Sequence, residues 1–156
     1  MTEPAGAQPP TTGSAWSPSG PSGPRAGFFR RLGAVIVDAL VVGIPVGIIL
    51  ALVNSSALYA LWTVVGLAYF TYFEGSQSGQ TVGKRALGIR VIDYQTGGPI
   101  GYGRAFIRWI GRIISALLCY LGYLWMLWDR EKQTWHDKLA NDVVVPTDAY
   151  PVHQWP

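Results

Sequence analysis

The chain has 156 residues, of which 49% are hydrophobic and 13% charged, roughly half the charged share of a soluble domain. Its single cysteine, Cys119, excludes an internal disulfide framework and is expected to be a small buried hydrophobe. The formal net charge is +3, and the positive residues flank apolar segments, which favours anionic lipid headgroups over nucleic acid as partners. The composition therefore predicts one small membrane domain with polar tails.

The N-terminal segment, residues 1–26, consists mainly of Pro, Gly, Ser and Thr and has almost nothing to bury. Such a composition predicts a disordered, extended tail. It does not resemble a signal peptide, because the apolar run after it begins too late and is too long.

The first apolar run, residues 32–53, is long enough to cross a bilayer, which needs about 20 helical residues. Asp38 lies inside it, where a carboxylate costs roughly 2.5–3.5 kcal/mol and usually has a partner. Arg31 lies two turns earlier on nearly the same face, but the backbones are roughly 10 Å apart. We therefore expect Asp38 to need a second group, either the arginines at 104–112 or Thr63 and Tyr69.

A second apolar run, residues 57–73, follows the short connection 54–56, so it is expected to return antiparallel beside the first. Its aromatic residues gather toward the ends, as in the aromatic belts of membrane helices. Arginines and lysines precede the first run and follow the second, whereas residues 54–56 have none. By the positive-inside rule, the N-terminus and the 74–103 connection are expected to be cytoplasmic.

The third apolar region, residues 105–128, has two unlike halves. Arg104, Arg108 and Arg112 are spaced four apart and form one stripe on a helix, predicted to contact lipid phosphates at the membrane interface. The second half, 115–128, is uncharged but short for a crossing of its own. Periodicity leaves open one tilted span or a re-entrant hairpin.

Two short strands are predicted at residues 88–93 and 142–146, the first followed by a Gly-rich turn. If they pair, both lie on the same side of the membrane, and the 105–128 region must then return to the side from which it came. We therefore expect both termini to be cytoplasmic.

The predicted fold class is an all-α membrane protein: a small bundle of two to three, or four short, transmembrane helices with a cytoplasmic strand pair. The expected organisation is a tail at 1–26, a membrane domain at 27–145 with spans near 32–53, 57–73 and 105–128, and a C-terminal tail at 146–156.

Three motifs in order resemble the RDD family of small bacterial membrane proteins: FFRRLGAVIVDALVV, GQTVGKRALGIRVIDYQTGGPIGYGRAFIRW and LWDREKQTWHDKLANDVVV. The resemblance covers residues 27–145 and places the family's Arg on Arg31 and its two Asp on Asp38 and Asp137. Where many members have Gly-Thr before the last strand, this chain has Asn141-Asp142. The resemblance implies a multi-pass protein of the bacterial plasma membrane, for which transport of unidentified ligands has been suggested.

Two classes of function remain open. In the first, Arg31, Asp38 and Asp137 form a site that binds or transports a small ligand or ion, and a homo-oligomer is expected because so few helices enclose little volume. In the second, the same charges stabilise the fold of an adaptor or assembly factor that recruits an unidentified protein partner. No spacing supports a catalytic group, a metal site or a cofactor site, so an enzyme is not expected.

Overall fold

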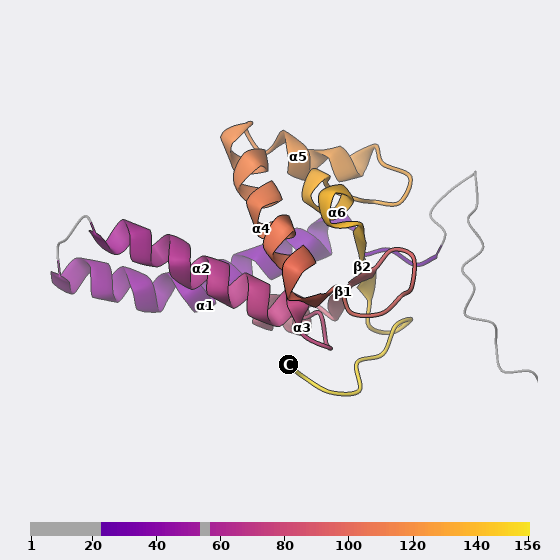
Figure 1. Cartoon of the computed structure of the whole chain (residues 1–156), viewed down its shortest axis with the longest axis horizontal. Helices are drawn as coiled ribbons and strands as arrows, with labels where there is room; N and C mark the ends of the chain where they lie inside the picture. Colours follow the sequence, from indigo (N-terminus) through magenta and orange to yellow (C-terminus); the bar gives the residue numbers. More distant parts are fainter. Residues whose placement is uncertain (1–22, 54–56) are drawn as a thin grey trace, which may run out of the picture.

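The computed structural model describes residues 23–53 and 57–156 (Figure 1). Most of the predicted N-terminal tail and the connection at 54–56 lie outside the described residues. The elements follow in the order α1 (Phe28–Val53), α2 (Ala57–Gly75), α3 (Val82–Ala86), β1 (Ile89–Asp93), α4 (Gly101–Leu117), α5 (Leu121–Leu124), the 3₁₀ helix η1 (Trp125–Leu127), α6 (Trp135–Ala140) and β2 (Asp142–Pro146). The prediction of a mostly helical fold with one strand pair is confirmed.

Helices α1 and α2 lie side by side and extend beyond the other elements (Figure 1). Residues Phe28–Ile49 of α1 have a mean hydropathy of 2.4, and α1 is the one unbroken helix among the described residues that is long and apolar enough to cross a membrane. Tyrosines, threonines and a terminal Glu74 make α2 less apolar. The structure therefore supports one membrane helix, α1. It does not by itself show the predicted bundle of several transmembrane helices.

The third predicted span is broken. Helix α4 is followed by Cys119 and Tyr120, whose φ angles of 54° and 59° lie in the left-handed region that non-glycine residues rarely adopt. The two halves, Gly101–Leu117 and Leu121–Leu127, meet at 111°, as a broken span or a re-entrant hairpin would. Cys119 is exposed at this bend, so the prediction that it is buried is wrong.

The predicted strand pairing is confirmed. Strands β1 and β2 run antiparallel, with Val91 opposite Val144. These two valines form a small core with Ile89 and Ala105, each no more than 1% exposed. The backbone N–H of Ala26 donates to the carbonyl oxygen of Val144 at 2.9 Å, so the chain just before α1 joins this core. The folded domain therefore begins before α1.

Because β1 and β2 pair, the segments before α4 and after α6 lie on one side of any membrane that the protein occupies. In a Cys119→Ser background, we expect Thr147→Cys to resist an impermeant maleimide applied to intact cells and to react after permeabilisation. Leu52→Cys, near the far end of α1 and exposed, is the matched control and should react from outside. Labelling of Thr147→Cys in intact cells would contradict the cytoplasmic placement.

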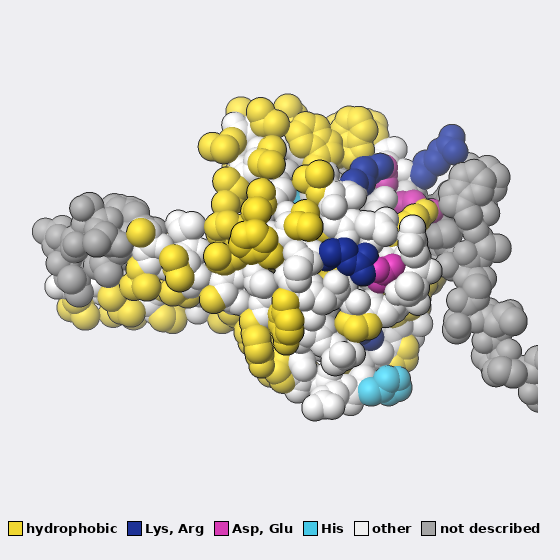
Figure 2. All heavy atoms as spheres, in the orientation of Figure 1, with side chains coloured by type: hydrophobic (Ala, Val, Ile, Leu, Met, Phe, Trp, Pro, Cys, Tyr) yellow, Lys and Arg dark blue, Asp and Glu magenta, His cyan; other side chains and the backbone are white. Residues whose placement is uncertain are grey.

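Large apolar side chains cover much of the outer surface of the helices. Figure 2 shows them along α1 and α2 and over α4 and α5. Ile36, Leu40 and Ile44 on α1 are each more than half exposed, and so is Leu121 on α5. Contiguous apolar surface of this kind marks an interaction site, and for α1 the acyl chains of a bilayer are a suitable covering.

Candidate functional site

Asp38 is buried in a pocket of hydrogen-bond donors. Its carboxylate accepts from the hydroxyl groups of Tyr69 at 2.8 Å and Thr81 at 2.7 Å and from the backbone N–H of Gly83 at 2.7 Å. Tyr69 was one of the predicted partners, and this prediction is confirmed. The other alternative, the arginines at 104–112, does not supply the partner, because polar groups of α2 and the start of α3 satisfy the carboxylate, and the nearby Arg31 pairs with Asp137.

The approach of α3 to α1 depends on Gly83. A Cβ atom at this position would lie 2.1 Å from the carbonyl oxygen of Ala34 and 2.8 Å from a carboxylate oxygen of Asp38. Thr81 caps the start of α3, since its hydroxyl accepts from the backbone N–H of Lys84 at 3.2 Å. Thr81 and Gly83 therefore fix the start of α3 to Asp38 at this depth of α1.

Arg31 contacts the second family Asp instead of the first. Its Nη1 lies 2.5 Å from Oδ2 of Asp137, and its Nη2 donates to the carbonyl oxygen of Lys132 at 2.8 Å. Asp137 is completely buried and also forms a capping box with Thr134 at the start of α6. Of the three predicted site residues, the structure brings Arg31 and Asp137 together and leaves Asp38 in a separate hydrogen-bond network.

The arginine stripe of α4 faces protein carboxylates. Arg108, 2% exposed, lies with its Nε 3.1 Å from Oε2 of Glu74 and also pairs with Asp137 and Asp142. Arg104 pairs with Asp93 on β1, and Arg112 pairs with Glu74. All three arginines of the stripe, Arg104, Arg108 and Arg112, which were predicted to contact lipid phosphates, form ion pairs with protein carboxylates, because four other segments (α2, β1, α6 and β2) place carboxylates along the stripe.

These contacts form one continuous ion-pair cluster that joins α1, α2, α3, α4, α6 and β2. Its members are Arg31, Glu74, Lys84, Arg108, Arg112, Asp137 and Asp142. Sequence reasoning missed Glu74, Lys84 and Asp142. Glu74 directly follows the second apolar run, and a charge at that boundary was the available signal for it. Lys84 was used only as a positive charge that predicts the cytoplasmic side. Asp142 was treated only as a departure from the family pattern before the last strand.

The carboxylates of Asp137 and Asp142 share Arg108 but titrate differently. Burial acts to raise the pKa of Asp137, yet Arg108 and Arg31 outweigh it and hold that pKa well below the usual range. Burial raises the pKa of Asp142 to about 8, because repulsion by Asp137 and Glu74 offsets much of the attraction of Arg108. Burial also lowers the pKa of His136, so this imidazole is neutral at pH 7.

The raised pKa of Asp142 predicts a pH-dependent stability. Between the ordinary pKa of about 4 and the folded value, the folded state keeps a proton that the unfolded state has released. The contribution of this retained proton to the unfolding free energy is full below about pH 4 and is lost as the pH rises through the folded pKa of about 8. The unfolding free energy of the wild type minus that of Asp142→Asn should therefore fall from about pH 5 to about pH 8 in detergent. A difference independent of pH would contradict the assignment.

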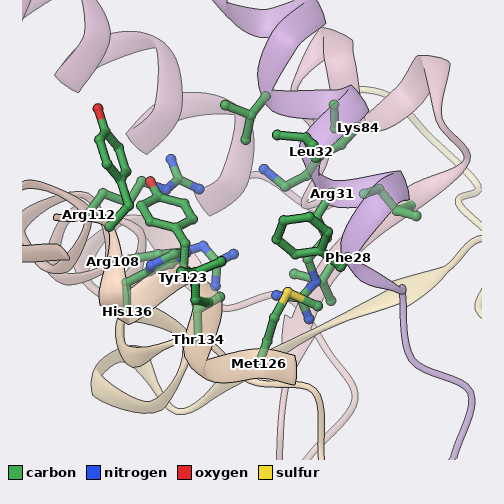
Figure 3. Close-up of a pocket in the computed structure, with 16 residues that line it drawn as sticks. Phe28, Arg31, Leu32, Lys84, Arg108, Arg112, Tyr123, Met126, Thr134 and His136 are labelled. Carbon is green, nitrogen blue, oxygen red and sulfur yellow. The ribbon is translucent and has the colours of Figure 1, made fainter. Parts of the chain in front are cut away.

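A cavity of about 320 Å³ adjoins the cluster (Figure 3). Its charged lining residues among the described part of the chain are all cations, namely Arg31, Lys84, Arg108 and Arg112. Apolar side chains of α1, of the α5–η1 segment and of both strands, such as Leu32, Met126 and Val144, form most of the rest of the wall, together with Thr134 and His136 at the start of α6. The carboxylates that pair with these cations are not among the lining residues, so the cavity presents a small basic patch on a largely apolar wall.

The family model described as "RDD family" matches residues 25–141. The chain belongs to the RDD family. The match includes the whole ion-pair cluster except Asp142, which lies one residue beyond it.

Several bacterial proteins are similar in sequence to this RDD domain. It is 38% identical over 89 residues to the "Proline-rich antigen homolog" of Mycobacterium tuberculosis, covering 55% of this chain and 37% of the relative. It is 33% identical over 97 residues to the "Proline-rich antigen" of Mycobacterium leprae, covering 60% of this chain and 39% of the relative. The chain thus spans about two fifths of these mycobacterial relatives.

A relative of similar length is the "Uncharacterized protein YxaI" of Bacillus subtilis. It is 25% identical over 147 residues, which cover 77% of this chain and 96% of the relative. No solved structure matches the RDD domain.

Proposed function

We propose that this RDD domain is a membrane protein that binds a small anionic ligand in the cavity beside the ion-pair cluster. The observation that supports the proposal is that cations are the charged residues lining the cavity in the described part of the chain. Arginine guanidinium groups form strong, often bidentate, hydrogen bonds with carboxylate and phosphate oxygens. The predicted site is thereby shifted from Arg31, Asp38 and Asp137 to Arg31, Lys84, Arg108 and Arg112, with Asp137 holding two of these cations in place.

The size of the cavity limits the ligand. Typical small-molecule sites measure roughly 300–1,000 Å³, so a cavity of about 320 Å³ suits a small group better than a large cofactor. A basic lining also disfavours a metal cation. The same cavity would serve a transporter as a binding site on one side of the membrane, whereas an adaptor would need no such ligand.

The location that we propose is the plasma membrane, with several crossings and a cytoplasmic N-terminus. The apolar helix α1 and the apolar, sharply bent α4–α5 pair support it. The cations near the cytoplasmic ends of the predicted spans support the orientation by the positive-inside rule.

Inorganic phosphate can test the proposal with the purified protein in dodecyl maltoside, whose headgroup is uncharged. We expect phosphate to raise the thermal unfolding midpoint of the wild type more than chloride does at equal ionic strength, because ligand binding stabilises the folded state. Arg112→Gln should reduce this shift, since Arg112 lines the cavity.

The matched control is Arg104→Gln, which removes a cation from the same helix outside the cavity lining. It should keep the full phosphate response. An equal response of both variants would mean that phosphate acts elsewhere, and the proposal would then be rejected.

A further inference from the structure

We infer that the ligand of this cavity is the phosphate-bearing headgroup of a membrane lipid, whose acyl chain leaves between α1 and α5. The inference rests on the proposed anion-binding function and names its ligand class. It is based on three features of the cavity: its rim, its cations and the surface onto which the rim opens.

The rim is apolar and exposed. Leu32 and Val35 from α1, together with Tyr120 and Leu124 beside and within α5, line the cavity and are between 36% and 61% exposed. Each of these side chains therefore contributes both to the cavity wall and to the outer surface. An anion without an apolar part would leave this wall without a contact.

The outer surface at the rim is the one that a bilayer would cover. Leu32 and Val35 lie within Phe28–Ile49, the part of α1 suited to cross a membrane. Leu124 lies in the second half of the bent α4–α5 pair, which passes the same test as a unit. A cavity with this rim opens sideways toward acyl chains, so a lipid could enter without leaving the membrane.

The inner end of the cavity suits a phosphate. Figure 3 shows Phe28, Arg31 and Leu32 of α1 across from Arg108, Arg112 and Tyr123. Within the described part of the chain, Nη1 of Arg112 is buried and has no hydrogen-bond partner, although Nη2 of the same guanidinium pairs with Glu74. A phosphate oxygen would supply the missing acceptor and would contact a cation that the carboxylates only partly satisfy.

Charge and apolar wall together distinguish this ligand from simpler ones. Inorganic phosphate or glycerol 3-phosphate offers the charge without the chain, and monoolein offers the chain without the charge. A lysophosphatidic acid has both parts, so it should use the cations and the rim at once. Its affinity should therefore exceed that of either part by about tenfold or more, since each part contributes separately.

The test measures binding of 1-oleoyl lysophosphatidic acid, glycerol 3-phosphate and monoolein to the full chain in dodecyl maltoside by native mass spectrometry and thermal shift. We expect lysophosphatidic acid to bind most tightly, by about tenfold. Arg112→Gln should weaken its binding and leave monoolein unchanged. Leu32→Asn at the rim should weaken the binding of lysophosphatidic acid and leave the binding of glycerol 3-phosphate unchanged. Arg104→Gln should change none of the three, and circular dichroism checks that each variant is folded.

Each contrary result has its own meaning. If glycerol 3-phosphate bound as tightly as lysophosphatidic acid, the proposed anion site would stand, but the inference that its ligand is a lipid would be rejected. Equal binding of monoolein and lysophosphatidic acid would overturn the role of the phosphate. Binding of neither phosphate compound would reject the proposed function itself. If Arg112→Gln fails to fold, Lys84→Gln replaces it as the change to a lining cation, and if Leu32→Asn fails to fold, Val35→Asn replaces it as the change to the apolar rim.

Discussion

Replacement of Arg108 by methionine is expected to destabilise the protein by about 3–5 kcal/mol, the usual cost of removing one partner from a buried ion pair. Arg108 is 2% exposed and contacts three carboxylates: Glu74, Asp137 and Asp142. Methionine matches the aliphatic part of arginine but carries no charge, so these carboxylates would lie close together without their shared cation. The measurement is the thermal unfolding midpoint in dodecyl maltoside, together with the folded fraction on gel filtration.

The matched control for Arg108 is Arg104→Met, one turn earlier on α4. The side chain of Arg104 is 33% exposed, and Asp93 is its one ion-pair partner among the described residues, so its loss should cost less than about 1 kcal/mol. If the two variants lost the same stability, the claim that Arg108 is the buried centre of the ion-pair cluster would be contradicted. A stable Arg108→Met protein would show that the carboxylates take up protons at little cost, as the raised pKa of Asp142 allows for that one group.

The second large effect is expected at Asp38. Replacement by alanine removes the acceptor for three donors, Tyr69, Thr81 and the backbone N–H of Gly83. A buried donor without an acceptor costs about 1–3 kcal/mol, so Asp38→Ala should lose about 3 kcal/mol or more. Tyr69→Phe removes a single donor and should lose about 1 kcal/mol. The measurement is again the unfolding midpoint in detergent.

Two further variants separate the hydrogen-bond network from a charge pair. Asp148→Ala removes an exposed carboxylate and should leave stability almost unchanged. The charge swap Arg31→Asp with Asp38→Arg should not recover stability, because Arg31 is bonded to Asp137 and Asp38 to neutral groups. Full recovery in the swap would mean that Arg31 and Asp38 form a private pair, against the arrangement found here.

The sequence by itself determined the features that depend on local pattern. The long apolar run, with Asp38 as its one charge, predicted α1, because a helix that crosses hydrocarbon must be mostly apolar over about 20 residues. Alternating and branched residues flanked by turn signals predicted the two strands that became β1 and β2, within one residue at their ends. The spacing of Arg104, Arg108 and Arg112 correctly placed all three on one face of a helix.

Only the tertiary structure decided what those faces contact. The arginine stripe was equally compatible with lipid phosphates and with protein carboxylates, since helical periodicity gives a direction and no partner. Glu74, Asp137 and Asp142 are separated by up to 68 positions in the sequence (142 − 74), yet they converge on Arg108. For the same reason, the partner of Arg31 could not be assigned from its place two turns before Asp38 on the helix. Its partner comes from α6, 106 positions along the chain, and that choice is made by packing.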